Sequence, residues 1–223
     1  MLSVLSLLET RVLGVLIEKE RTVPDSYPLT LNSLVSGCNQ KSSRDPIINA
    51  TESEVQSALD TLKSMSLVIE SSGGRVSRYS HNFERVLQVP RQASALLAVL
   101  MLRGPQTAGE LRINSERLHA FADISSVEAF LTELAERPAG ALIAELSRQP
   151  GARENRWMHL LSGPPPAGDV APPPVSEPGS MTIGVTEVAA LKANVSRLEK
   201  DVDELKAQIA RICAELGITR GSD

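Results

Sequence analysis

Apolar residues recur every three or four positions in the N-terminal part of the chain, which is the spacing of amphipathic helices. The pattern predicts one helix over residues 9–20, a second near 29–38 and a third over 51–63. Thr51 and Glu54 have the spacing of a capping box, so the third helix is expected to begin just after Thr51. We therefore expect three helices that bury their apolar faces against one another.

A β-hairpin is expected after the third helix, because strand-like segments over 67–71 and 75–81 flank the turn at Gly73-Gly74. Three helices followed by a hairpin is the order of a winged helix-turn-helix domain. The same order returns downstream, which favours an internal duplication. The repeated segments are helices over 90–103, from Thr107 onward and over 125–136, and strands over 142–146 and 156–160.

A heptad pattern occupies the C-terminal part of the chain. Its β-branched and leucine positions favour a parallel two-stranded coiled coil, and a trimer is the alternative because Ile212 stands at a d position. The segment before it is rich in proline and is expected to be an extended tether. The apolar residues expected to hold the helices together are Val188, Leu191, Val195, Leu198, Val202, Leu205, Ile209, Ile212 and Leu216.

These patterns predict a mainly α chain with small β-hairpins, an α+β class: tandem winged helix-turn-helix domains followed by a C-terminal coiled-coil helix. The expected parts are a first winged-helix domain, a second one, a flexible linker, the coiled coil and a disordered tail. Their boundaries are 1–89, 90–161, 162–184, 185–217 and 218–223.

Composition narrows the class of protein. Net charge is −4, which does not suit a strongly basic nucleic-acid coat protein. Cys38 and Cys213 lie in unrelated segments and fit a reducing cytoplasm better than a disulfide framework. The N-terminus lacks the basic region of a signal peptide, and the longest apolar stretch, 93–102, is too short to span a bilayer. We expect a cytoplasmic protein with no membrane partner and a buried helix over that stretch.

Four motifs carry a family resemblance. They are EKE at 18–20, PDSYPLTLN at 24–32, CNQKSSRDP at 38–46 and LRGPQTAGELR at 102–112. In these motifs the chain closely resembles the YceH family of uncharacterised bacterial proteins, over roughly residues 5–161. The resemblance implies tandem winged helices, with a C-terminal coiled coil in some members. It implies no particular mechanism.

DNA is one candidate partner, since the third helix of a winged helix usually enters the major groove. On that helix Glu52 and Asp60 would be repelled by phosphates. The candidate lysines and arginines of this unit could equally be ordinary solvated surface charges. The second unit has an acidic third helix, with Glu128 and Glu133, which suits a protein partner better. The candidate nucleic-acid-binding residues are Lys41, Ser42, Arg44, Gln56, Lys63, Arg75 and Arg78.

Catalysis has little support, because His81, His119 and His159 are far apart in sequence and no Cys/His cluster has metal-ligand spacing. We expect no enzyme activity, no catalytic residue, no metal and no cofactor. The leading hypothesis is an oligomeric, DNA-binding, regulator-like protein whose partners are itself and DNA. The alternative is a protein-interaction scaffold in which the tandem winged helices grip another protein without DNA contact.

Overall fold

The structure is a computed structural model that describes residues 4–74, 76–148 and 152–164. Contacts along the chain separate Met1–Pro173 from Pro174–Asp223, and every described residue belongs to the first of these units. The predicted linker from residue 165 onward, the coiled coil and the tail, with all nine predicted oligomerisation residues, lie outside the described residues. Those assignments therefore stay predictions.

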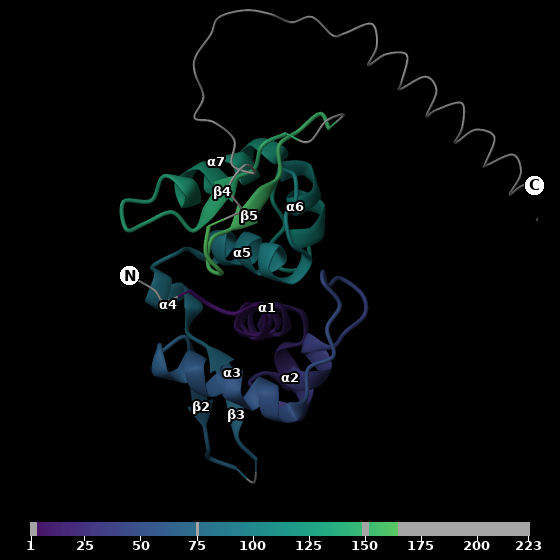
Figure 1. Cartoon of the computed structure of the whole chain (residues 1–223), viewed down its shortest axis with the longest axis vertical. Coiled ribbons are helices and arrows are strands. Elements are labelled where there is room, and N and C mark those ends of the chain that lie inside the picture. The colour runs from purple at the N-terminus through teal and green to yellow at the C-terminus, as the bar shows by residue number, and fades with distance from the viewer. Residues whose placement is uncertain (1–3, 75, 149–151, 165–223) are drawn as a thin grey trace, which may run out of the picture. The chain divides into compact units, whose positions relative to one another are not determined.

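Helix α1, Leu7–Thr22, lies at the centre of the described unit (Figure 1). Its first turn is closed by a capping box: the Ser6 hydroxyl accepts from the Glu9 amide, and the Glu9 carboxylate accepts from the Ser6 amide. Residues 10–17 of the helix are all buried. A helix buried all round cannot be a solvent-facing surface element, so α1 is a central core helix on which other helices of the unit pack.

We define the first half of the unit as residues 4–81, which includes α1. Most of its other elements lie below α1 in Figure 1. This half closes with a small antiparallel sheet of strand order β1-β3-β2, in which Leu29 pairs with Tyr79 and Val68 with His81. After α1 its elements are η1 (Pro24–Ser26), β1 (Leu29–Thr30), α2 (Leu31–Cys38), α3 (Glu52–Ser64), β2 (Val68–Ser71) and β3 (Arg78–His81).

The second half, residues 82–164, repeats this order with a smaller sheet. Its two strands are antiparallel, with Ile143 opposite His159 and Glu145 opposite Trp157. Its elements are α4 (Phe83–Leu87), α5 (Arg91–Arg103), α6 (Ala108–Ser115), α7 (Ile124–Ala135), β4 (Ile143–Glu145) and β5 (Trp157–His159). Helix α4 was not predicted, because a five-residue helix is too short to show a period.

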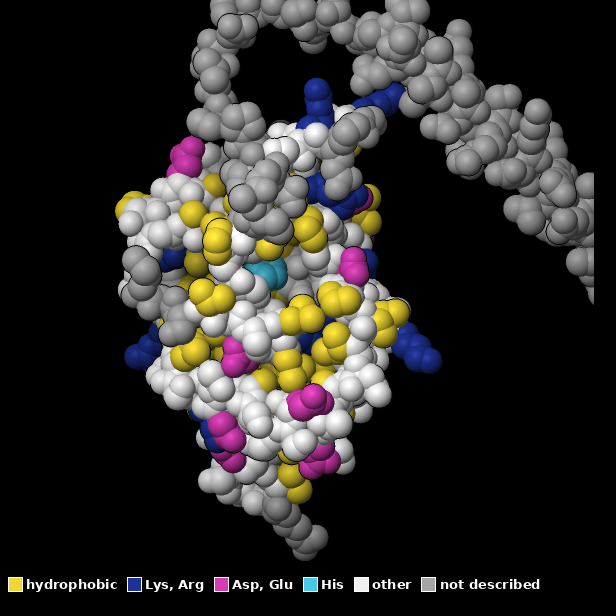
Figure 2. Space-filling view, in the orientation of Figure 1, with side chains coloured by type: hydrophobic (Ala, Val, Ile, Leu, Met, Phe, Trp, Pro, Cys, Tyr) yellow, Lys and Arg dark blue, Asp and Glu magenta, His cyan; other side chains and the backbone are white. Residues whose placement is uncertain are grey.

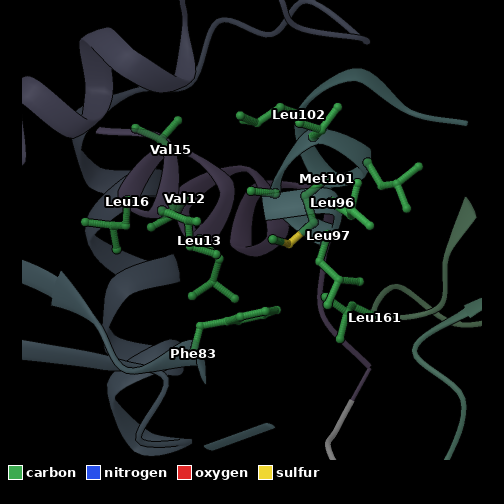
Figure 3. Packing of buried hydrophobic residues seen from close by; sticks show 14 of the residues in the cluster. Val12, Leu13, Val15, Leu16, Phe83, Leu96, Leu97, Met101, Leu102 and Leu161 are labelled. Atoms are coloured by element: carbon green, nitrogen blue, oxygen red, sulfur yellow. The ribbon is translucent and has the colours of Figure 1, made fainter. Parts of the chain in front are cut away.

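The two halves share one hydrophobic core. Helix α5 is buried along residues 93–102, as its apolar stretch predicted, and it packs against α1 (Figure 3). Gly14 permits the close approach: a Cβ atom there would stand 2.9 Å from Leu102 Cγ and Cδ2. Leu13, Leu97 and Phe83 meet at the same seam and are buried. The core is therefore continuous across the boundary predicted at residue 89.

The mixed α and β class is confirmed, and the predicted helices and strands lie within a few residues of the elements observed. The expected second helix begins two residues later than predicted because Leu29 and Thr30 form β1. The winged helix-turn-helix assignment of each half stays a prediction. No helix among the described residues is long and apolar enough to cross a membrane.

Candidate functional site

Helix α3 was expected to present Gln56 to a DNA base. The structure instead places the Gln56 side chain between two internal partners. Its Nε2 donates to Asp60 Oδ1 at 3.1 Å, and its Oε1 accepts from the Tyr79 hydroxyl at 3.3 Å. The bond to Asp60 stays within α3, and the bond from Tyr79 joins α3 to β3. Both ends of the amide are thereby engaged, so a two-point contact of Gln56 with a base would compete with these bonds.

Lys63, expected to hold a phosphate, is engaged with two carboxylates. Its Nζ lies 2.7 Å from Glu70 Oε2 and 2.9 Å from Asp60 Oδ1. The hydrogen bonds with Glu70 and then Asp60 raise the pKa of Lys63 above its ordinary value, and those with Lys63 lower the pKa of Glu70 and of Asp60. The local charge around Lys63 is therefore negative.

The structure corrects the prediction for Arg44. We expected its side chain on the surface of a polar loop, but it is buried and forms a two-pronged ion pair with Glu18 at 2.7 and 3.1 Å. Its Nε also donates to the Gly37 carbonyl at 3.1 Å. Burial alone would raise the pKa of Glu18, but the hydrogen bonds and charge of Arg44 outweigh it and hold that pKa below its ordinary value. Arg44 fastens the loop to α1 and is not placed for a phosphate contact.

Lys41, Ser42 and Arg78 are exposed, as predicted for a binding surface. The Arg78 guanidinium donates to the Pro28 carbonyl at 2.8 Å, which fixes its position beside β1. Arg75 lies outside the described residues. The six predicted residues that the structure describes are thus not brought together as one cationic surface, and the exposed cations among them are Lys41 and Arg78.

Carboxylates dominate the surface that α3 and β2 present. In Figure 2, Asp and Glu side chains gather over the lower part of the molecule, where these elements lie. The chain contributes Glu52, Glu54, Asp60 and Glu70 there, against Lys63 alone from the same two elements. A negative surface repels the phosphate backbone of DNA, because non-specific affinity for DNA comes from cations that neutralise phosphates.

A cleft of about 610 Å³ lies in the second half, lined by residues of α7, of the start of α6 and of the β4 and β5 region. We call it the α7 cleft. Trp157, half-buried and the only tryptophan of the chain, and Ile124, 45% exposed, supply its large apolar side chains. Its remaining lining is Ala108, Glu128, Thr132, Glu145, Arg148, Arg153, Glu154 and Asn155.

Some polar side chains around the α7 cleft are paired with another side chain, and others are not. Asn155 donates to Glu145 Oε1 at 2.9 Å, which fixes the segment that leads into β5. By contrast, Glu128, Arg148 and Arg153 have no partner among the described residues. Neither Ile124 nor Trp157 was singled out from the sequence. The lone tryptophan was the one available signal, since tryptophan is common at binding sites.

His81 and His159 have different surroundings. His81 Nε2 lies 3.0 Å from Glu20 Oε2, while burial lowers the pKa of His159 to about 4. Cys38 is buried, which raises the pKa of its thiol to about 12 and makes a reactive thiolate unfavourable. Within the described ranges, no group of three or more His, Cys, Asp or Glu side chains is placed to hold a metal ion.

Comparison with known proteins places these features in a family. Residues 5–152 match the model of the family described as protein of unknown function DUF480. A UPF0502 protein of Dechloromonas aromatica is 62% identical over 205 residues, covering 91% of this chain and 93% of that protein. UPF0502 proteins of Methylibium petroleiphilum and Burkholderia ambifaria are 59% and 57% identical, over 97% and 95% of this chain and 92% and 89% of theirs. The resemblance inferred from the four motifs is thereby confirmed, and the chain belongs to this DUF480, YceH-like family of bacterial proteins.

Proposed function

We propose that this chain is a non-enzymatic protein-interaction module built from two winged helices. The order of the elements supports the two winged helices, because in each half a third helix, α3 or α7, is followed by a pair of antiparallel strands. In the first half β1 joins that pair in the order β1-β3-β2. On this assignment, α3 and α7 stand where DNA-binding winged helices carry the helix that enters the major groove.

The observation that carries the proposal is the composition of the α7 cleft. Trp157 and Ile124 offer apolar area, and Glu128, Arg148 and Arg153 stand around them without partners among the described residues. Interfaces between proteins combine aromatic and arginine anchors with a polar rim in this way, whereas a DNA groove would require a cationic helix face. Helix α7 carries no Lys or Arg between Ile124 and Ala135.

DNA binding by the first half is the second candidate function. The exposed Lys41 and Arg78 favour it, because both are placed where a phosphate could approach. The carboxylates of α3 and β2 oppose it by like-charge repulsion. Self-association through the heptad helix is part of either function, and it would raise the local concentration of the binding surfaces.

Site-specific photo-crosslinking in the bacterium that encodes the chain tests the proposal. A photoreactive residue at Thr132, in the α7 cleft, should give a discrete adduct with another protein, and the same residue at Arg85, exposed on α4, should not. The second change Ile124→Glu should remove the adduct. Once a partner is purified, the fluorescence of Trp157 should change on binding, since no other tryptophan contributes.

Duplex DNA provides the opposing test. The full chain should show no binding to random or genomic duplexes at about 50 mM salt, where phosphate contacts are strong. Binding that weakens as salt rises, and that is lost when Lys41 and Arg78 are both replaced by alanine, would favour the DNA function instead. Equal crosslinking from Thr132 and Arg85 would also count against the α7 cleft as the binding surface.

A further inference from the structure

A second, smaller pocket lies where the two halves meet. Its volume is about 210 Å³. We call it the junction pocket. Its lining comes from α1, from the loop after α2, from the end of α5 and from the end of α6. The polar residues that matter here are Lys19, Gln40, Ser42, Arg103, Asn114 and Arg117.

The junction pocket has an excess of positive charge. Lys19, Arg103 and Arg117 enter its lining from three different elements, and Glu18 is its one carboxylate. The charge of Glu18 is already balanced by the buried Arg44, which contacts both of its carboxylate oxygens. Lys19 Nζ also lies 3.3 Å from Glu18 Oε2, a longer and more exposed contact. Lys19 Nζ donates to Gln40 Oε1 at 3.4 Å as well. The lining thus carries three cations against one carboxylate, and Arg103 and Arg117 have no carboxylate partner among the described residues.

The walls of the junction pocket are held in place by hydrogen bonds. Arg103 Nη2 donates to the Ser43 hydroxyl at 2.7 Å, which ties α5 to the loop after α2. Ser43 has φ of 59°, a left-handed conformation that is costly for a residue with a side chain. Gln40 Nε2 donates to the carbonyl and the hydroxyl of Ser42 at 3.0 and 3.1 Å. Arg117 has no partner among the described residues, so its guanidinium is available.

We infer that the junction pocket binds a small phosphate monoester. Two guanidinium groups and an ammonium group are the donors that phosphate oxygens prefer. The Ser42 and Ser43 hydroxyls beside them suit the hydroxyls of an attached small organic group, because each can still donate its proton. The volume is below the roughly 300 Å³ at which drug-sized sites begin, which excludes a large ligand. Because Lys19 belongs to the first half and Arg103 and Arg117 to the second, the bound anion joins the two halves.

Calorimetric titration of the full chain tests this inference. The probes are inorganic phosphate, glycerol 3-phosphate and succinate, all at one ionic strength set with sodium chloride. Glycerol 3-phosphate should bind in saturable fashion and more tightly than succinate. The change Arg117→Gln should weaken its binding by about tenfold or more, the loss expected when a charge-assisted hydrogen bond is removed.

Arg85→Gln is the matched control, because Arg85 is an exposed arginine on α4 that does not line the pocket and has no partner among the described residues. This variant should bind glycerol 3-phosphate as the unchanged chain does. Equal weakening in both variants would show a general charge effect and overturn the inference. So would the absence of saturable binding, or tighter binding of succinate than of either phosphate. Thermal unfolding without ligand checks that both variants are folded.

Discussion

The two halves of the described unit hold the segment before their third helix in different ways. In the first half, Arg11 donates to the carbonyls of Cys38 and Pro46, and Arg44 pairs with Glu18 from inside the protein. In the second half, the corresponding segment is held at its surface, where Arg112 donates to the Ala122 carbonyl. A long polar loop thus needs buried cations to fix it, while a short connection needs only exposed bonds.

The two halves share an order of helices and strands, but their surfaces differ in which charged side chains are paired inside the protein. The first half uses its loop cations as internal supports, which removes Arg44 from the surface and leaves the carboxylates of α3 and β2 dominant. The second half keeps unpaired charges and Trp157 around an open cleft. The first half is closer in sequence to a DNA-binding domain than the second half. Its basic residues are nevertheless the ones more often paired with other groups of the protein.

The largest expected loss of stability comes from breaking the buried ion pair between Arg44 and Glu18. Arg44→Met should cost about 3–5 kcal/mol of unfolding free energy, because it leaves the Glu18 carboxylate half-enclosed without its partner. The matched change in the second half is Arg156→Met, which breaks a pair with Glu110 whose side chains are 40% and 42% exposed. That change should cost about 1 kcal/mol or less, as exposed pairs do. Urea unfolding of the full chain measures both.

Similar losses in the two variants would contradict the contrast between a buried and an exposed support. A second change separates the charge from the packing. Adding Glu18→Gln to Arg44→Met should recover part of the lost stability, since it removes the carboxylate that the first change left unpaired. No recovery would mean that Arg44 stabilises the loop through its other bonds, to the carbonyls of Gly37 and Ser43.

The next loss of stability is expected in the core that the two halves share, where α1 packs against α5. Leu97 is buried at that seam, so Leu97→Ala should cost about 2–5 kcal/mol. Because the core is continuous, we expect the described unit to lose stability as a whole. Calorimetry should show one unfolding transition that moves to lower temperature. A transition that splits, with one part unmoved, would show instead that the halves unfold independently.

A buried histidine makes the second half sensitive to acid. Burial lowers the pKa of His159 to about 4, so the folded chain keeps it neutral while the unfolded chain protonates it near pH 6.5. The unfolded state then binds more protons, and stability falls as pH decreases from about 6.5 toward 4, by at most about 1.4 kcal/mol per pH unit. Urea unfolding between pH 7 and 5 should show this slope, and His159→Gln should reduce it. An unchanged slope would assign the effect to other groups.

The smallest effects come from helix caps. Thr51 closes the first turn of α3 and Thr107 that of α6, each in a capping box with a glutamate three residues later. Thr51→Ala and Thr107→Ala should each cost about 1 kcal/mol. The Thr107 change should be the larger, because Glu110 of its box also pairs with Arg156 and links α6 to the segment before β5. The order of the two losses, measured by urea unfolding, checks this.

Much of the fold could be predicted from local pattern. The helices follow from apolar spacing, the start of α3 from Thr51 and Glu54, and the buried α5 from the longest apolar stretch of the chain. These features depend on residues close in sequence, so a single sequence contains them. Helix α4 and strand β1 are too short to show a period, and β1 exists only because β3 pairs with it.

The candidate sites were less predictable, because they depend on distant partners. The sequence determined that Arg44, Gln56 and Lys63 are polar residues in a loop and on a helix. Only the tertiary structure brought Glu18 to Arg44, Tyr79 to Gln56 and Glu70 to Lys63, across separations of 26, 23 and 7 residues. A side chain whose hydrogen-bonding groups are all used inside the protein has none left for an outside partner. Periodicity therefore determined which elements form, and packing decided which of their charges remain available.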